Sequence, residues 1–201
     1  MQIASENPDL QNVFNQFHKI ERYGYADHCT LQFIISSKLA FELNIADEAT
    51  LRKLTFASLF HDMALTDYLY EHEAKYLKII MQNEPNPPKD VKDMISHPTR
   101  GAELCRKWDF CPAVVDTIIF QHHERPDGNG FPMGKRAHEL HPLSCLSILS
   151  EDFVLYFMRY FGEPDIGKFI ATRKGLYSDG YFKICFDALI KALAPAAQKA
   201  S

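Results

Sequence analysis

The stretch QHHERPDGNGFP, residues 121 to 132, carries two adjacent histidines and then a run that is rich in Gly, Asp, Asn and Pro. An apolar segment precedes it. The side chains of His122 and His123 are costly to bury unless each ring nitrogen finds a partner. The residues that follow favour tight turns. The stretch therefore predicts a helix that ends in two imidazoles and is followed by a structured loop.

Apolar residues recur at helical spacing through nearly all of the chain. In the segment 26–43, Leu31, Ile35 and Leu39 share one face. Spacing, caps and breakers predict further helices at 7–22, 47–62, 67–82, 88–96, 97–108, 112–123, 142–161, 164–175 and 179–195. No segment alternates with the period of a strand. We therefore expect an all-α fold, divided into an N-terminal helix in residues 1–24, a core in 25–160 and C-terminal helices in 161–201 that pack on the core.

Composition and charge exclude several classes of protein. The 201 residues carry a net charge of −4 without a run of Lys or Arg, which excludes a surface for long nucleic acid but not a small phosphorylated ligand. No apolar run reaches the roughly 18 residues of a membrane span, so no membrane insertion is expected. The polar N-terminus is unlike a signal peptide. The five cysteines contain no CxxC pair. These features favour reduced thiols and a cytoplasmic location.

Histidines and acids recur near the ends of separate predicted helices, at His28, His61-Asp62, His97 and His122-His123. Each position taken alone also has a structural explanation, as a cap, a surface side chain or a polar residue on a helix face. His97, which precedes Pro98, is expected at a helix start. Helices of this length, packed antiparallel, could bring all four positions to one end of a bundle.

Imidazoles and carboxylates together suit iron, manganese or zinc and not calcium. The set exceeds what one ion needs, so a centre with two divalent ions is expected, iron being favoured and manganese or zinc being the alternatives. In such centres the ions lie about 3.5–4 Å apart and a bridging hydroxide acts as the nucleophile.

The ordered motifs resemble the HD superfamily of metal phosphohydrolases, and within it the HD-GYP branch, which is known for cyclic-di-GMP phosphodiesterases. The matching elements are His28, then HD at 61–62, HPTRG at 97–101 and HHERPDGNGFP at 122–132, with Phe131 where the family has Tyr. They cover about residues 25–157. The resemblance implies an HD-domain helical bundle with the metal site at one end and a C-terminal helical extension.

The resemblance also implies roles for individual residues. A further acidic ligand is expected on the helix after the loop, and an ungapped count places it at Glu151, with Asp152 as the neighbouring alternative; both acids could instead lie on the wet face of that helix. One ion would be held by His28, His61, Asp62 and Glu151. The other would be held by Asp62, His97, His122 and His123, with Asp62 as the catalytic bridge that orients the nucleophile. The glycine-rich loop would form one wall of the substrate cleft, with candidate contacts at Arg125, Asp127, Gly128, Gly130, Lys135 and Arg136.

Three departures from the family pattern concern the phosphate contacts and the number of ions. Leu65 replaces a Lys that is expected to contact a substrate phosphate, which removes a cation. The family's RPY-like motif is absent, and Tyr160 stands where its Arg is counted, with Arg159 one residue away. Gly24 stands where trinuclear members have a Glu, which favours two ions. Replacement cations are available at Arg100, Arg125, Lys135 and Arg136, although each could be a solvated surface charge.

The leading hypothesis is a metal-dependent phosphodiesterase that acts on a cyclic dinucleotide, namely cyclic-di-GMP. The first alternative is a catalytically weak or inactive domain that binds a cyclic dinucleotide or partner proteins in signalling, as a monomer or a dimer. The second alternative is another HD-type phosphohydrolase that acts on nucleotides or phosphomonoesters.

Overall fold

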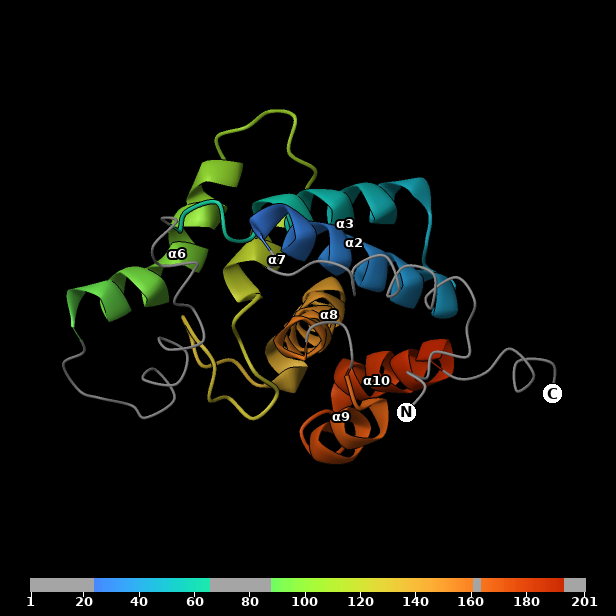
Figure 1. Ribbon diagram of the computed structural model, residues 1–201. Helices are drawn as coiled ribbons and strands as arrows, with labels where there is room; N and C mark the ends of the chain where they lie inside the picture. Colours follow the sequence, from blue (N-terminus) through green and yellow to red (C-terminus); the bar gives the residue numbers. More distant parts are fainter. Residues whose placement is uncertain (1–23, 66–87, 161–163, 194–201) are drawn as a thin grey trace.

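The computed structural model describes residues 24–65, 88–160 and 164–193, and its central element is α8 (Pro142–Arg159) (Figure 1). Pro142 stands at the first helical position, where its fixed φ suits a helix and its missing N–H costs nothing. The Nδ1 atom of His141 accepts the backbone N–H of Leu143 at 3.2 Å and caps the helix. Thirteen of its residues are buried, which is the pattern of a helix covered on most sides.

Two antiparallel helices cover one side of α8, namely α2 (Tyr25–Glu42) and α3 (Glu48–Phe60) (Figure 1). The turn between them uses Asn44, whose φ of 56° lies in the left-handed region that Asn tolerates. The carboxylate of Asp47 then accepts the N–H of Thr50 at 2.7 Å and caps α3. This short connection fixes the start of α2 beside the end of α3, where His28 and His61 lie.

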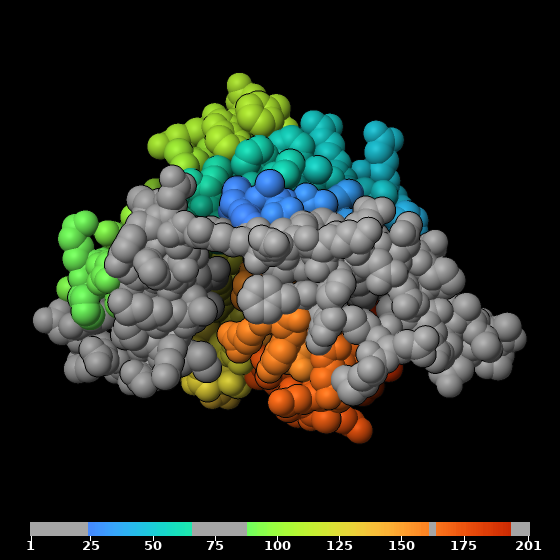
Figure 2. All heavy atoms as spheres, in the orientation of Figure 1, coloured from blue at the N-terminus to red at the C-terminus, as the bar shows by residue number. Residues whose placement is uncertain are grey.

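The C-terminal helices α9 (Ile166–Arg173) and α10 (Gly180–Leu193) lie on the other side of α8 (Figure 1). Helix α10 contacts both α8 and α2. Together the helices enclose one apolar core, whose most deeply buried members include Leu39, Leu146, Leu149, Phe153, Phe169, Phe182 and Cys185. In the space-filling view these orange and red helices form the bottom of the molecule, and the segment 106–114 stands at the top (Figure 2).

Helix α6 (Lys89–Cys105) corrects two predictions. The segments 88–96 and 97–108 were expected as separate helices with His97 at a start, but a single helix runs through Pro98. A proline ordinarily leaves the carbonyl four residues earlier without its helical partner. Here the Nδ1 atom of His97 lies 2.6 Å from that carbonyl, on Met94, and supplies the hydrogen bond instead.

After α6 the chain forms α7 (Val115–Gln121), then a loop with the short 3-10 helix η1 (Ala137–Glu139), before α8 begins. Helix α7 packs on α6, α3 and α8. The parts of the chain that the structure describes hold seven α-helices and no strand beyond an isolated bridge between Asp127 and Arg136, so the predicted all-α fold is confirmed. The helices expected at 7–22 and 67–82 lie outside the described residues, and the division of the chain into three segments stays a prediction.

Candidate metal centre

Seven polar side chains from five helical elements meet at one place beside α8. His61 and Asp62 directly follow α3, His28 lies in the first turns of α2, and His97 lies in the middle of α6. His122 and His123 follow α7, and Glu151 lies on α8. Their ligand atoms form two groups, within each of which they lie no more than 4.8 Å apart. One group is Asp62, His97, His122 and His123, and the other is His28, His61 and Glu151.

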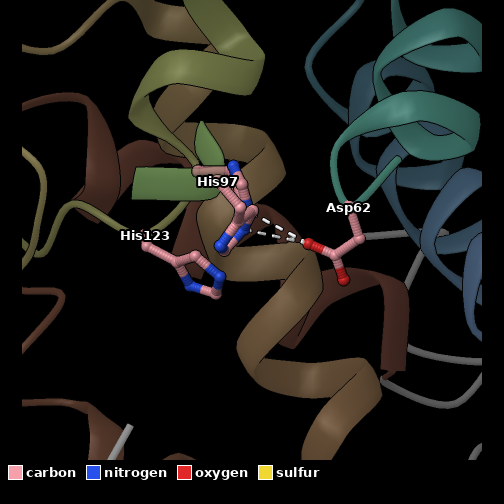
Figure 3. Close-up of side chains that lie close together, drawn as sticks. Asp62, His97 and His123 are labelled. Atoms are coloured by element: carbon pink, nitrogen blue, oxygen red, sulfur yellow. Dashed lines mark hydrogen bonds and ion pairs between the residues drawn. The ribbon is translucent and has the colours of Figure 1, made fainter. Parts of the chain in front are cut away.

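The first group is arranged around one oxygen of Asp62. Oδ1 lies 3.2 Å from Nε2 of His97 and 3.3 Å from Nε2 of His122. The two Nε2 atoms lie 3.0 Å from each other. Asp62 points at His97 from the end of α3, and His123 lies next to His97 (Figure 3). Four donor atoms thus converge on one small volume.

The second group lies on the other side of Asp62. Nε2 of His28 lies 3.1 Å from Oε1 of Glu151 and 3.0 Å from Nε2 of His61. The Nε2 atom of His61 lies 3.9 Å from Oε2 of Glu151 and 3.3 Å from Oδ2 of Asp62. Asp62 therefore presents one oxygen to each group, which is the geometry of a bridging carboxylate.

The carboxylates of this site are charged and buried. Burial acts to raise the pKa of Asp62, but the facing imidazoles, His61 and His122 foremost, outweigh burial and hold that pKa well below its ordinary value. For Glu151 the same balance, with His28 as the main imidazole, leaves the pKa lowered. Both oxygens of each carboxylate are buried, and none has a hydrogen-bond donor unless a facing imidazole carries its proton on Nε2.

Two imidazoles of this site, His122 and His123, resist protonation. Burial lowers the pKa of His122, and burial together with neighbouring imidazoles holds the pKa of His123 well below its ordinary value. The Nδ1 atoms of His97 and His122 lie within hydrogen-bond distance of backbone carbonyls, so a neutral ring carries its proton there and turns the lone pair of Nε2 inward. At 3.0 Å these two lone pairs would repel each other. Cations bound between these groups would give the buried carboxylate oxygens a partner and would separate the facing nitrogen lone pairs. The donor set therefore fits divalent metal ions.

Glu151 and its neighbour Asp152 lie in different environments. Asp152 accepts two hydrogen bonds from Arg173, at 2.7 and 3.1 Å, and one from the hydroxyl of Tyr177 at 3.0 Å. Successive residues of a helix point about 100° apart, so Glu151 reaches the histidines while Asp152 ties α8 to the segment around α9. Of the two acids considered from the sequence, the structure brings Glu151 into the site.

The loop after His123 is closed by a residue that the sequence analysis did not single out. The carboxylate of Glu124, which is fully buried, accepts the N–H groups of Met133 at 2.7 Å and Lys135 at 2.8 Å. The ring of Phe131 stacks on His123 with centroids 4.6 Å apart. The available signal was the position of Glu124 directly before a loop rich in Gly and Pro, where a carboxylate can accept backbone N–H groups.

The predicted substrate-binding residues lie along this loop and partly build it. Gly128 has a φ of +80°, and a Cβ on Gly130 would lie 2.4 Å from the backbone nitrogen of Arg125. Asp127 accepts the N–H of Asn129 at 3.1 Å and forms a backbone bridge with Arg136. Gly128 is therefore favoured by its backbone conformation, and Gly130 by the lack of space for a side chain. Contact of these residues, or of Lys135, with a substrate stays a prediction.

Arg100 lies near the place where Leu65 replaces the family's Lys. Its Nη2 atom donates to the carbonyl of Ala64 at 3.0 Å and to that of Asp93 at 3.2 Å, and Nη1 lies 3.7 Å from the Asp93 carboxylate. This cation is partly neutralised by Asp93.

Comparisons with known proteins agree with this picture. A family model described as HD domain matches residues 34–163, a range that includes six of the seven candidate ligands and leaves out His28.

None of the helices in residues 24–65, 88–160 and 164–193 has the length and apolarity needed to cross a bilayer. No curated protein sequence matches this chain.

Solved structures with a similar fold include the following two. One is a cyclic GMP-AMP specific phosphodiesterase of V. cholerae, V-cGAP3, with a TM-score of 0.56 and 19% identity over 82% of this chain and 44% of that chain. The other is Bd1817, an HDG"Y"P protein of Bdellovibrio bacteriovorus, with a TM-score of 0.56 and 22% identity over 94% of this chain and 60% of that chain. This chain thus spans less than two thirds of either protein.

Proposed function

This chain belongs to the HD domain family, and from that premise we propose that it is a phosphohydrolase that depends on two divalent metal ions. The observation that carries the proposal is the position of Asp62, whose Oδ1 faces His97 and His122 while Oδ2 faces His61. One ion would be held by His28, His61, Asp62 and Glu151, and the other by Asp62, His97, His122 and His123. Iron is favoured, with manganese or zinc as alternatives.

Divalent cations in such a site supply Lewis acidity and lower the pKa of a coordinated water, which suits attack on a phosphodiester. The protein's own contribution is orientation and charge. Asp62, with its lowered pKa, stays ionised between the two ligand groups and orients the attacking water. His122 and His123, with their lowered pKa values, stay neutral and keep Nε2 or Nδ1 available as ligands.

We propose cyclic-di-GMP as the substrate. The proposal is supported by the ordered HD-GYP-like motifs and by the fold shared with a cyclic GMP-AMP phosphodiesterase. The loop that begins at Glu124 would form one wall of the cleft, with Arg125, Lys135 and Arg136 as cations for the two phosphates. The cytoplasmic location that a nucleotide second messenger requires stays a prediction, and the described cysteines are free thiols.

A second candidate function is binding without turnover. It is favoured by the loss of a cation at Leu65 and by the engagement of Arg100 with Asp93. Such a domain would hold a cyclic dinucleotide, or signalling partners, through the same loop. A protein partner or a dimer would then transmit the bound state.

The deciding experiment is turnover by protein whose content of iron or manganese has been measured. We expect conversion of cyclic-di-GMP to the linear dinucleotide, and loss of conversion in Asp62→Ala. Cyclic GMP-AMP, bis(p-nitrophenyl) phosphate and nucleoside monophosphates complete the panel. Hydrolysis of monophosphates alone would assign a different HD-type phosphohydrolase. Saturable binding of cyclic-di-GMP without any product, with both ions present, would favour the binding module.

A further inference from the structure

Three imidazoles of the candidate metal centre are held in the same way. In each, Nδ1 lies within hydrogen-bond distance of the backbone carbonyl three residues earlier: 3.0 Å from His61 to Ser58, 2.6 Å from His97 to Met94 and 2.6 Å from His122 to Ile119. An Nδ1–H donor of this kind fixes the tautomer and the rotation of the ring. In all three cases Nε2 is left to face the other ligands.

A helix carbonyl is most open to such a bond where no backbone N–H competes for it, although its two lone pairs can accept two donors. His61 and His122 each stand directly after the last residue of a helix, Phe60 in α3 and Gln121 in α7. The last four carbonyls of a helix lack partners within the helix, so Ser58 and Ile119 have carbonyls to offer. The position at the helix end explains two of the three bonds.

His97 is different because it lies in the middle of α6, eight residues before its end at Cys105. There the carbonyl of Met94 would normally accept the N–H of the residue four positions later. That residue is Pro98, which has no N–H. The proline therefore creates, inside a helix, the same unpaired carbonyl that a helix end provides for His61 and His122.

We propose that Pro98 is a positioning residue for the metal centre: by withholding an N–H from the Met94 carbonyl, it reserves that carbonyl for Nδ1 of His97 and so presents Nε2 to the site. This inference rests on the proposed function in so far as the site binds metal. The bond between His97 and Met94 is itself a property of the protein without metal. Pro98 is buried and directly follows His97 in α6.

The chain contains a second His-Pro pair that serves as a matched control. His141-Pro142 stands at the start of α8, where Pro142 occupies the first helical position and Nδ1 of His141 accepts, rather than donates, a hydrogen bond from Leu143. Pro142 thus starts a helix and does not leave a carbonyl unpaired inside one. The substitution Pro142→Ala makes the same chemical change as Pro98→Ala, but the N–H that it restores does not compete for a carbonyl that holds a candidate ligand.

The test combines two measurements on Pro98→Ala, Pro142→Ala and the unsubstituted protein. The first is the tautomer of His97 in the metal-free protein, read from ¹⁵N chemical shifts of labelled histidine, with His97→Gln to assign the signal. We expect the Nδ1–H form in the unsubstituted protein and in Pro142→Ala. In Pro98→Ala the restored N–H competes for the Met94 carbonyl, so the Nε2–H form should become populated.

The second measurement is the Kd for Mn²⁺ alone, by titration of the metal-free protein. A disturbed outer hydrogen bond weakens metal binding about 10- to 100-fold, so we expect a rise of that size in Pro98→Ala and none in Pro142→Ala. The melting temperature of metal-free Pro98→Ala should not fall, because alanine suits a helix interior better than proline. If Pro98 had only a structural role, Pro98→Ala would lower the melting temperature and leave the tautomer of His97 unchanged. That result would overturn the inference. An unchanged tautomer with an unchanged Kd would overturn it too. If the unsubstituted protein binds none of Mn²⁺, Fe²⁺ and Zn²⁺ while the tautomer of Pro98→Ala changes, the proposed function fails, and the part of the inference that concerns the His97–Met94 hydrogen bond stands.

Discussion

Oε1 of Glu151 lies 3.1 Å from Nε2 of His28, and this contact joins α8 to α2 inside the candidate metal centre. The next residue, Asp152, makes no part of it and instead pairs with Arg173 at 2.7 Å. Two adjacent acids on one helix thus serve two purposes, one at the site and one in the packing of the C-terminal helices. This separation can be tested with isosteric amides, which remove the charge and keep the shape.

Glu151→Gln should lose metal, because an amide is a poor ligand for these ions and leaves Asp62 as the only carboxylate beside His28 and His61. We expect about half of the bound metal to be lost, measured by elemental analysis of purified protein. Asp152→Asn should keep the metal but reduce the free energy of unfolding by about 1–3 kcal/mol, because Arg173 loses a charged hydrogen-bond partner. Equal metal loss in both variants would contradict the assignment of Glu151.

Metal should stabilise the folded protein, since the ligand groups converge only in the folded chain. At a free Mn²⁺ concentration of about 100 times Kd the gain is about 2.7 kcal/mol. For a chain of this size that gain corresponds to a rise in melting temperature of about 5–11 °C. Scanning calorimetry with Mn²⁺ or with a chelator measures it. His61→Ala and Asp62→Ala should abolish most of the rise; a full rise in both would place the metal elsewhere.

Phe131 should be needed for its ring and not for a hydroxyl. Its ring is buried and stacks on His123 with an interplanar angle of 24°. Phe131→Ala should reduce the free energy of unfolding by about 3–5 kcal/mol and weaken Mn²⁺ binding, because His123 loses its support. Phe131→Tyr, which keeps the ring, should stay within about 1 kcal/mol of the original stability. Urea unfolding and Mn²⁺ titration give both quantities, and a large loss in the tyrosine variant would argue against this role.

Gly130 should tolerate no side chain. A Cβ there would lie 2.4 Å from the backbone nitrogen of Arg125 and 2.5 Å from Cα of Glu124, and backbone atoms cannot move aside cheaply. Gly130→Ala should therefore cost about 1–3 kcal/mol of stability. Gly175→Ala is the control, since a Cβ there meets nothing within 4 Å, and it should be neutral or stabilising by about 0.4–1 kcal/mol. Similar losses in both variants would mean that the loop is not packed this closely.

Stability should fall in alkali because of the buried thiols. Burial raises the pKa of Cys29, Cys105 and Cys145 to about 12, against an ordinary value of 9.0. Since the folded-state pKa is raised, the stabilisation is fully present below pH 9 and is lost as the pH rises toward 12. Each thiol contributes a slope of at most about 1.4 kcal/mol per pH unit. Urea unfolding under reducing conditions between pH 8 and 10.5 should show this slope, and Cys145→Ala should make it shallower. An unchanged slope would count against the burial of that thiol.

Local patterns were sufficient to predict the all-α fold and the residues that converge at the candidate metal centre. Helical spacing depends on neighbours within a few turns, and the HD, HPTRG and HHERPDGNGFP motifs are short and ordered. The sequence also contained Gly128 and Gly130, whose backbone needs are local to the loop. The wrong break at His97 followed from the ordinary rule that a helix does not continue through the residue before a proline.

The tertiary structure alone decided which way the side chains face. Whether Glu151 or Asp152 enters the site depends on the rotation of α8 against α2, and no spacing within α8 specifies that rotation. Whether the helix ends before Pro98 or continues through it depends on a partner for the Met94 carbonyl. Nδ1 of His97 is that partner, while Nε2 of the same ring faces Asp62 and His122. The sequence by itself determined which groups are present and in what order. The packing of segments far apart in the chain determined which of their atoms meet. Hydrogen bonds and ligand contacts form only when two atoms lie within a few tenths of an ångström of the required distance, and the local sequence does not encode such distances.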